Sequence, residues 1–200
     1  RGAGNVLGKS QHGHMAAVGY DLYCKMLNQA VNDLKGIKNE YDFETTVDME
    51  VDAYIPATYI KSEYQKLDIY KRIAALETRE ELSDMRDELA DRYGSIPSSA
   101  ANLLMIALIK TKAHKIGIMD IKGATKHNPS GGVSNWRTVM TIYPKADINS
   151  DNIQQLVDTF GGALEFKLKS TPEFVWTVTK RKFSSAREYL DGMLDMMDIM

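Results

Sequence analysis

The feature that most constrains the fold of this chain is a change in its hydrophobic period at Gly117. Three helix signatures stand before that glycine: a capping-box pair at Ser62 and Gln65, a second pair at Thr78 and Glu81, and Pro97 at the expected first helical position. Gly94 is placed to end the second helix. The segment from 62 to 117 therefore predicts three consecutive helices.

Beyond Gly117 the apolar residues follow the two-residue period of strands. Strand-like runs occupy 118–122, 133–143, 163–169 and 174–179. Two more helices are expected at 150–160 and 185–200, the second beginning with a capping box at Ser185 and Glu188. Strands and helices mix without a regular βαβ repeat. This order favours an α+β fold in which several helices pack on a small mixed or antiparallel sheet.

A glycine-rich loop and one helix precede this region. Residues 1–13 contain four glycines and no hydrophobic period, which predicts a loop. Apolar residues then recur at spacings of three and four from Met15 to Leu34, so one amphipathic helix is expected there. Because the chain opens at Arg1 inside a loop, with no strand or helix before it, we expect it to begin within a larger protein.

A polar linker at 38–44 separates that helix from the rest of the chain. Apolar and acidic residues alternate from Val47 to Ala53, which predicts a half-exposed strand ended by Pro56. We therefore divide the chain into an N-terminal part, residues 1–37, and a C-terminal domain, residues 45–200.

Composition excludes several classes of protein. The longest apolar stretch, Leu103 to Ile109, is far short of the roughly 20 residues that cross a bilayer, so we expect a cytoplasmic chain without a membrane partner. Cys24 is the only cysteine, which rules out an internal disulfide and a cysteine-cluster metal site. A net charge of −2 and a pI near 6.1 argue against tight autonomous DNA binding.

Residues 3–10, A-G-N-V-L-G-K-S, satisfy the loose phosphate-loop pattern, so a free-standing nucleotide-binding enzyme is the alternative interpretation. A working phosphate loop needs a preceding strand, a following helix and a later aspartate that holds magnesium. No strand can precede Ala3 within this chain, and no aspartate closing an apolar strand stands out. We expect the chain alone to be non-catalytic, and calorimetric titration with ATP and magnesium separates the two interpretations.

Two further patterns have simple interpretations beside functional ones. His12 and His14 lie two apart without supporting ligands and predict no zinc site. An acidic stripe runs along the helix expected near 79–93, at Asp84, Asp87, Glu88 and Asp91. Such a stripe is either a solvated face or a docking surface for a basic partner, and the chain also fits an unrelated protein-interaction module. The spacing of the Ser, Cys, His and Asp residues predicts no catalytic Ser/His/Asp or Cys/His arrangement.

Several segments carry a family resemblance. Residues 1–13, R-G-A-G-N-V-L-G-K-S-Q-H-G, and the stretch V-G-Y-D-L-Y-C-K-M-L-N-Q-A-V from Val18 resemble the translocation motif shared by transcription-repair coupling factors (Mfd proteins) and the RecG helicase. The stretches I-P-A-T-Y-I from Ile55, K-L-D-I-Y-K-R-I-A from Lys66 and E-L-A-D-R-Y-G-S-I-P from Glu88 are similar to the TRCF domain, which RecG lacks. The pair of matches, from Arg1 to about Asp120, selects the coupling factors.

The resemblance implies a coupling role for residues 1–37. In this family the translocation motif lies beside the ATPase lobes and converts their closure into a step along double-stranded DNA. Its functional arginine and glutamine fall on Arg1 and Gln11. The glycines of the motif are Gly2, Gly4, Gly8 and Gly13. The resemblance places ATP and magnesium in the intact protein, with no cofactor and no metal expected in this fragment.

For residues 45–200 the resemblance implies a regulatory domain. Such a domain docks on a UvrB-like module of the same chain and autoinhibits UvrA binding and motor activity. Glu88 and Asp91 are the candidates for contacts with basic residues of that module. The intact protein is then expected to be an ATP-hydrolysing double-stranded DNA translocase of helicase superfamily 2, which displaces stalled RNA polymerase and recruits the UvrA machinery of nucleotide excision repair.

Overall fold

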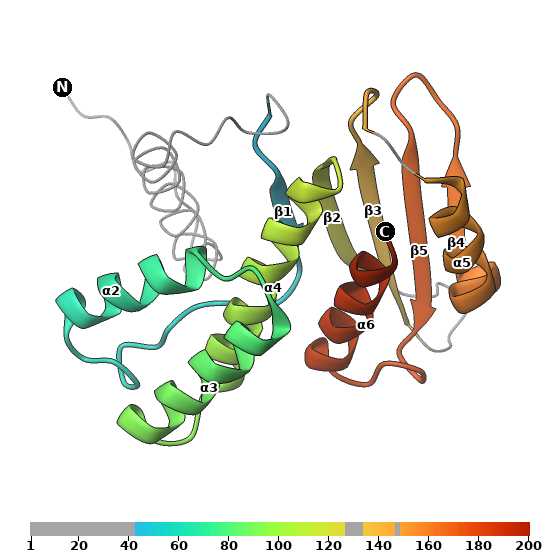
Figure 1. The fold of residues 1–200 in the computed structure, drawn as a ribbon. Helices are drawn as coiled ribbons and strands as arrows, with labels where there is room; N and C mark the ends of the chain where they lie inside the picture. Colours follow the sequence, from blue (N-terminus) through green and yellow to red (C-terminus); the bar gives the residue numbers. More distant parts are fainter. Residues whose placement is uncertain (1–42, 127–133, 147–148) are drawn as a thin grey trace, which may run out of the picture.

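A five-stranded mixed sheet and five α-helices form the part of the chain that the computed structural model describes, residues 43–126, 134–146 and 149–200. The expected α+β class is confirmed. Helices α2 and α3 lie beyond α4 and away from the sheet (Figure 1). The translocation motif and the helix expected at 15–34 lie outside the described residues.

The three consecutive helices are confirmed as α2 (Glu63–Ala74), α3 (Arg79–Tyr93) and α4 (Ser98–Lys115). Their predicted ends hold because caps are local: Ser62 Oγ accepts from the Gln65 N–H, and Thr78 with Glu81 closes a full capping box. Gly94 and Gly117 follow α3 and α4 with φ of 84° and 82°, which favours glycine. Pro97 is the N-cap rather than the first helical residue, because its ψ is extended.

The sheet has the strand order β1-β2-β3-β5-β4. Its members are β1 (Thr46–Met49), β2 (Ile118–Lys126), β3 (Asn135–Ile142), β4 (Leu164–Lys167) and β5 (Glu173–Thr179). β1 pairs parallel with β2, and the other pairings are antiparallel. The observed bounds of β2, β3, β4 and β5 lie within a few residues of the predicted ones.

The strand expected at 47–53 ends early, at Met49. The chain turns there, because the Val51 N–H donates back to the Met49 carbonyl oxygen. The following residues bind to the start of α4: Asn102 Nδ2 donates to the Asp52 carbonyl oxygen, and the Tyr54 N–H donates to the Ser99 carbonyl oxygen. Hydrogen bonds to α4 thus replace the strand pairing that the alternation of apolar and acidic residues predicted for this segment.

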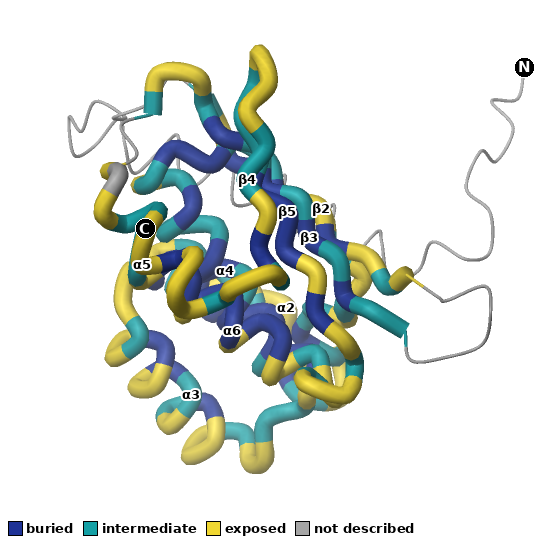
Figure 2. The backbone as a smooth tube through the Cα atoms, turned by 90° about the vertical axis from the view of Figure 1, so that its right-hand side faces the viewer, coloured by how far each residue is buried: buried dark blue, intermediate teal, exposed yellow. Residues whose placement is uncertain are grey.

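Helices cover one face of the sheet. α5 (Ser150–Phe160) and α6 (Ala186–Ile199) join α4 on one side of the strands, as Figure 2 shows. Side chains alternate accordingly along β3, where Trp136, Thr138, Met140 and Ile142 are buried. Thr177 and Lys122 on the neighbouring strands are exposed on the opposite face.

An aromatic stack joins α6 to the sheet. The Tyr189 ring lies between the two tryptophans, at centroid distances of 4.6 Å from Trp136 and 5.4 Å from Trp176. Phe160 and Phe183 meet the Trp176 ring edge to face. Stacked and edge-to-face pairs each contribute about 0.5–1.5 kcal/mol beyond area burial, so this cluster fixes α6 on the sheet.

Helix α6 approaches Trp176 closely because Gly192 has no side chain. A Cβ atom there would lie 3.0 Å from both Trp176 Cη2 and Phe183 Cζ. We expect Gly192→Val to lower the free energy of unfolding by about 1–3 kcal/mol, because a valine must displace packed aromatic rings. Urea unfolding followed by tryptophan fluorescence measures the change.

Gly162→Val is the matched control, since a Cβ at Gly162 meets no atom within 4 Å. We expect it to change the free energy of unfolding by about 0.5 kcal/mol or less. Equal losses in the two variants would contradict the close packing of α6 on Trp176.

Candidate partner-docking face

The outer face of α3 is the candidate site. Leu82, Met85 and Leu89 turn inward to the core. Opposite them lies an acidic face, which we define as Glu80, Asp84, Asp87 and Asp91. These carboxylates recur at spacings of four, three and four, so they share one side of the helix. All four are exposed, and within the described ranges none forms an ion pair. Glu80 extends the predicted stripe by one turn, and the same spacing could have identified it.

Glu88 does not belong to this free face. Both of its carboxylate oxygens bind Arg72 of α2, with Arg72 Nη1 donating to Oε1 at 2.6 Å and Nη2 donating to Oε2. Arg92 Nη1 donates to Oε1 as well, at 3.1 Å. The hydrogen bonds from Arg72, aided by Arg92, lower the pKa of Glu88 to about 2. Glu88 therefore fastens α3 to α2, while Asp91 stays available to a partner.

The C-terminal end of α3 is held by a tyrosine. The Tyr59 hydroxyl donates toward the carbonyl oxygens of Leu89 and Gly94, at 2.9 and 3.1 Å. Its ring meets Tyr93 edge to face at 5.8 Å. Burial, together with the neighbouring Tyr93, raises the pKa of Tyr59, so its hydroxyl remains a donor.

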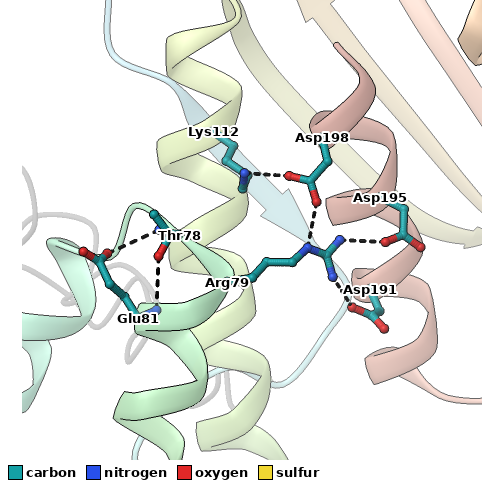
Figure 3. Close-up of polar contacts among 7 residues, drawn as sticks. All are labelled: Thr78, Arg79, Glu81, Lys112, Asp191, Asp195 and Asp198. Atoms are coloured by element: carbon teal, nitrogen blue, oxygen red, sulfur yellow. Dashed lines mark hydrogen bonds and ion pairs between the residues drawn. The ribbon is translucent and has the colours of Figure 1, made fainter.

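The N-terminal end of α3 is held by Arg79. Figure 3 shows its guanidinium directed at three aspartates of α6: Nη1 donates to Asp191 at 2.9 Å, Nη2 to Asp195 at 2.7 Å and Nε to Asp198 at 2.7 Å. Lys112 of α4 also pairs with Asp198, at 2.6 Å. The Thr78–Glu81 capping box lies beside this cluster.

This cluster joins three helices. Burial raises the pKa of Asp198, but hydrogen bonds from Lys112 and Arg79 outweigh it and leave the pKa below its ordinary value. Asp198 is therefore a carboxylate at neutral pH, and it ties α3 and α4 to α6. With Tyr59 and Glu88, the cluster fixes α3 at both ends, so the acidic face is presented without further ordering.

The residues predicted to form the translocation motif are not among those that the structure describes. Arg1, Gly2, Gly4, Gly8, Gln11 and Gly13 lie outside the described residues, as do the phosphate-loop pattern at 3–10, His12, His14 and Cys24. Within the described ranges no group of three His, Cys, Asp or Glu side chains could hold a metal ion. In the same ranges no helix has the length and apolar character needed to span a membrane.

Comparison with known proteins gives the chain its relatives. Residues 49–130 match the TRCF domain. The chain is 39% identical over 197 residues to the transcription-repair-coupling factor of Staphylococcus epidermidis and 36% identical over 199 residues to that of Bacillus subtilis, covering 96% and 98% of this chain. It spans 16% of the length of each of these relatives.

A solved structure has the same fold. It is described as the crystal structure of the C-terminal domain of transcription-repair coupling factor. The match has a TM-score of 0.61 with 21% sequence identity, and it covers 78% of this chain and 91% of that one. At this identity the match supports the fold alone.

The Glu88–Arg72 pair predicts a pH dependence of stability. Because the pKa of Glu88 falls from 4.5 to about 2 on folding, its contribution is present above pH 4.5 and is lost as the pH falls toward 2. Glu88→Gln should lower the free energy of unfolding by about 1 kcal/mol at pH 7, since the pair is one third exposed and screened. The deficit should shrink steadily below pH 4.5 in urea titrations.

Asp91→Asn is the matched control on the same helix. Asp91 is exposed and makes no ion pair with a described residue, so the variant should follow the wild type at every pH. A deficit for Glu88→Gln that stayed constant with pH would mean that lost packing, rather than lost charge, destabilises the protein.

Proposed function

The chain belongs to the transcription-repair coupling factor family, and we propose that it is the C-terminal piece of an ATP-driven translocase on double-stranded DNA that displaces stalled RNA polymerase and recruits UvrA. The name and coverage of the relatives support this proposal, as does the fold shared with a coupling-factor C-terminal domain. The chain spans 16% of those relatives. In this proposal the motor itself lies in the rest of the protein.

Within that protein we assign residues 45–200 a regulatory role. The acidic face of α3 docks on basic residues of the UvrB-like module, which restrains the motor and covers the surface that UvrA binds. The observation that carries this role is a row of four exposed carboxylates on a helix fixed at both ends. A fixed helix loses little conformational freedom on docking, so more of the charge attraction remains as affinity.

Glu88 and Asp91 then have different parts in docking. Asp91 is free to pair with a partner cation. The Glu88 carboxylate binds both Arg72 and Arg92, and the Glu88 side chain is still 34% exposed. Glu88 therefore positions α3, and the two arginines already balance most of its charge. Asp91 and the other carboxylates of the acidic face supply the charge that a partner can pair with.

Residues 1–37 couple ATP hydrolysis to movement in this proposal. Arg1 offers five donors and Gln11 both a donor and an acceptor, which suits them to transmit movement between the lobes and DNA rather than to perform bond chemistry. ATP and magnesium would bind the lobes, so this chain alone is non-catalytic. The intact protein would act in the cytoplasm.

The regulatory role is tested in the full-length protein by charge reversal. Asp87→Lys with Asp91→Lys should raise UvrA capture and polymerase-independent ATPase activity, because exposed contacts worth about 0.2–1 kcal/mol each are replaced by repulsion. Deletion of all residues after about Lys38 should raise both further. UvrA pull-down and steady-state ATPase assays measure the effects.

The control is Asp48→Lys with Asp52→Lys, which makes the same charge change at exposed positions outside α3. We expect it to leave UvrA capture at the wild-type level. Unchanged UvrA capture after the complete deletion would rule out the regulatory role, whereas an inactive charge reversal alone would remove only the acidic face from the interface.

The coupling role is tested at Arg1 and Gln11. In the full-length protein, Arg1→Ala or Gln11→Ala should retain most ATP hydrolysis while losing displacement of stalled RNA polymerase or of a DNA triplex. The physical reason is that the motif transmits lobe movement without contributing to the chemistry of hydrolysis. Parallel loss of hydrolysis and displacement would contradict this assignment.

A further inference from the structure

Positive charge gathers at one end of the sheet, although the chain as a whole carries a net charge of −2. We call this surface the basic rim. Its residues are Lys126, Arg137, Lys180, Arg181, Lys182 and Arg187. They come from β2, β3, the turn after β5 and the first turn of α6. No residue of the rim lies on α3, so it is separate from the acidic face.

Strand register brings these residues together. Lys126 at the end of β2 pairs with Asn135, which pairs in turn with Thr179 at the end of β5. The Lys180 N–H then donates to the Ser134 carbonyl oxygen at 2.9 Å. The chain from Thr179 into α6 therefore leaves the sheet at the same end as the end of β2, with β3 between them, at the lower edge of the sheet in Figure 1.

The turn that carries three of the cations is held in place. Lys180 Nζ lies 4.3 Å from the centroid of the Trp136 ring, in a cation–π contact. Trp136 Nε1 donates to the Phe183 carbonyl oxygen at 3.1 Å. The Lys182 N–H closes the turn by donating to the Thr179 carbonyl oxygen at 2.9 Å. These contacts fix the backbone of the turn, and Arg181 and Lys182 are exposed on it.

In the part of the chain that the structure describes, the positive charges of the rim are not balanced by ion pairs, unlike those between the helices. None of its six cations pairs with a carboxylate of the described residues. Two nearby acids are engaged with backbone: Glu50 accepts from the Thr125 N–H, and Glu188 accepts from the Ser184 and Ser185 N–H groups. The sequence of 127–133, which joins β2 to β3, contains no Asp or Glu.

We propose that the basic rim is a contact surface for the phosphate backbone of duplex DNA. Unpaired Lys and Arg side chains are the groups that bind phosphate oxygens along a duplex. Base stacking is not available, because the Trp136 side chain is 7% exposed and already stacked on Tyr189, so backbone contact to a duplex is favoured over a single strand. The choice of duplex DNA among polyanions rests on the proposed function, which the name of the relatives, transcription-repair-coupling factor, supports.

The contact is weak and electrostatic. It supplies affinity without sequence preference, because contacts to phosphate carry no sequence information. An affinity in the non-specific range of roughly 10⁻⁴ to 10⁻⁶ M agrees with the negative net charge of the chain. Such a contact adds an anchor for DNA that the motor already holds.

The test measures fluorescence anisotropy of a labelled duplex with the 200-residue chain at salt concentrations from roughly 50 to 200 mM. Wild type should bind with a clear salt dependence. Lys126→Glu with Lys182→Glu should weaken binding by about tenfold at the lowest salt and reduce the salt slope by about 2, one for each lost phosphate contact. Both residues are exposed, so circular dichroism should show an unchanged fold.

Lys61→Glu with Lys71→Glu is the matched control, since it makes the same charge change at two exposed lysines beside and within α2. It should weaken binding less than twofold. Equal weakening by both pairs, or no salt-dependent binding by wild type, would overturn the proposal. A poly-glutamate peptide that binds the wild type more tightly than the duplex, and loses binding in the rim variant, would instead identify an acidic protein partner.

Discussion

The stack of Tyr189 between Trp136 and Trp176 is the contact on which the rest of the structure depends. It seats α6 on the sheet, and the opposite side of α6 carries the carboxylates that bind Arg79. Helix α6 thereby helps to set the position of α3, and of its acidic face, relative to the sheet. Trp136 also holds Lys180 of the basic rim. Both proposed binding surfaces therefore rest on the same aromatic packing.

Charges in this domain divide into balanced and unbalanced groups. Where elements meet, cations and carboxylates are matched: Arg72 with Glu88 between α2 and α3, and Lys112 with Asp198 between α4 and α6. Two groups of unpaired charges among the described residues, each of one sign, lie on the surface as the acidic face and the basic rim. A net charge near zero thus hides two surfaces of opposite sign, which suits the two different partners proposed for them.

Local signals in the sequence predicted the ends of the helices, because a cap such as Thr78–Glu81 or Ser185–Glu188 is complete within four residues. Long-range pairs could not be predicted in this way. The acidic stripe included Glu88, yet its partner Arg72 lies on another helix, and Arg79 meets its aspartates more than a hundred residues along the chain. The basic rim likewise exists only once strand register is known.

The strength of the acidic face suits reversible control. Exposed ion pairs contribute about 0.2–1 kcal/mol each, so the proposed docking through the four carboxylates of α3 would supply roughly 1–3 kcal/mol of electrostatic free energy. That equals the coupling free energy of typical allosteric systems, which changes an equilibrium about 5- to 150-fold. A restraint of this size yields when a competing partner binds, whereas a large apolar interface would not. The fixed helix makes this small attraction effective, because little of it is spent on ordering α3.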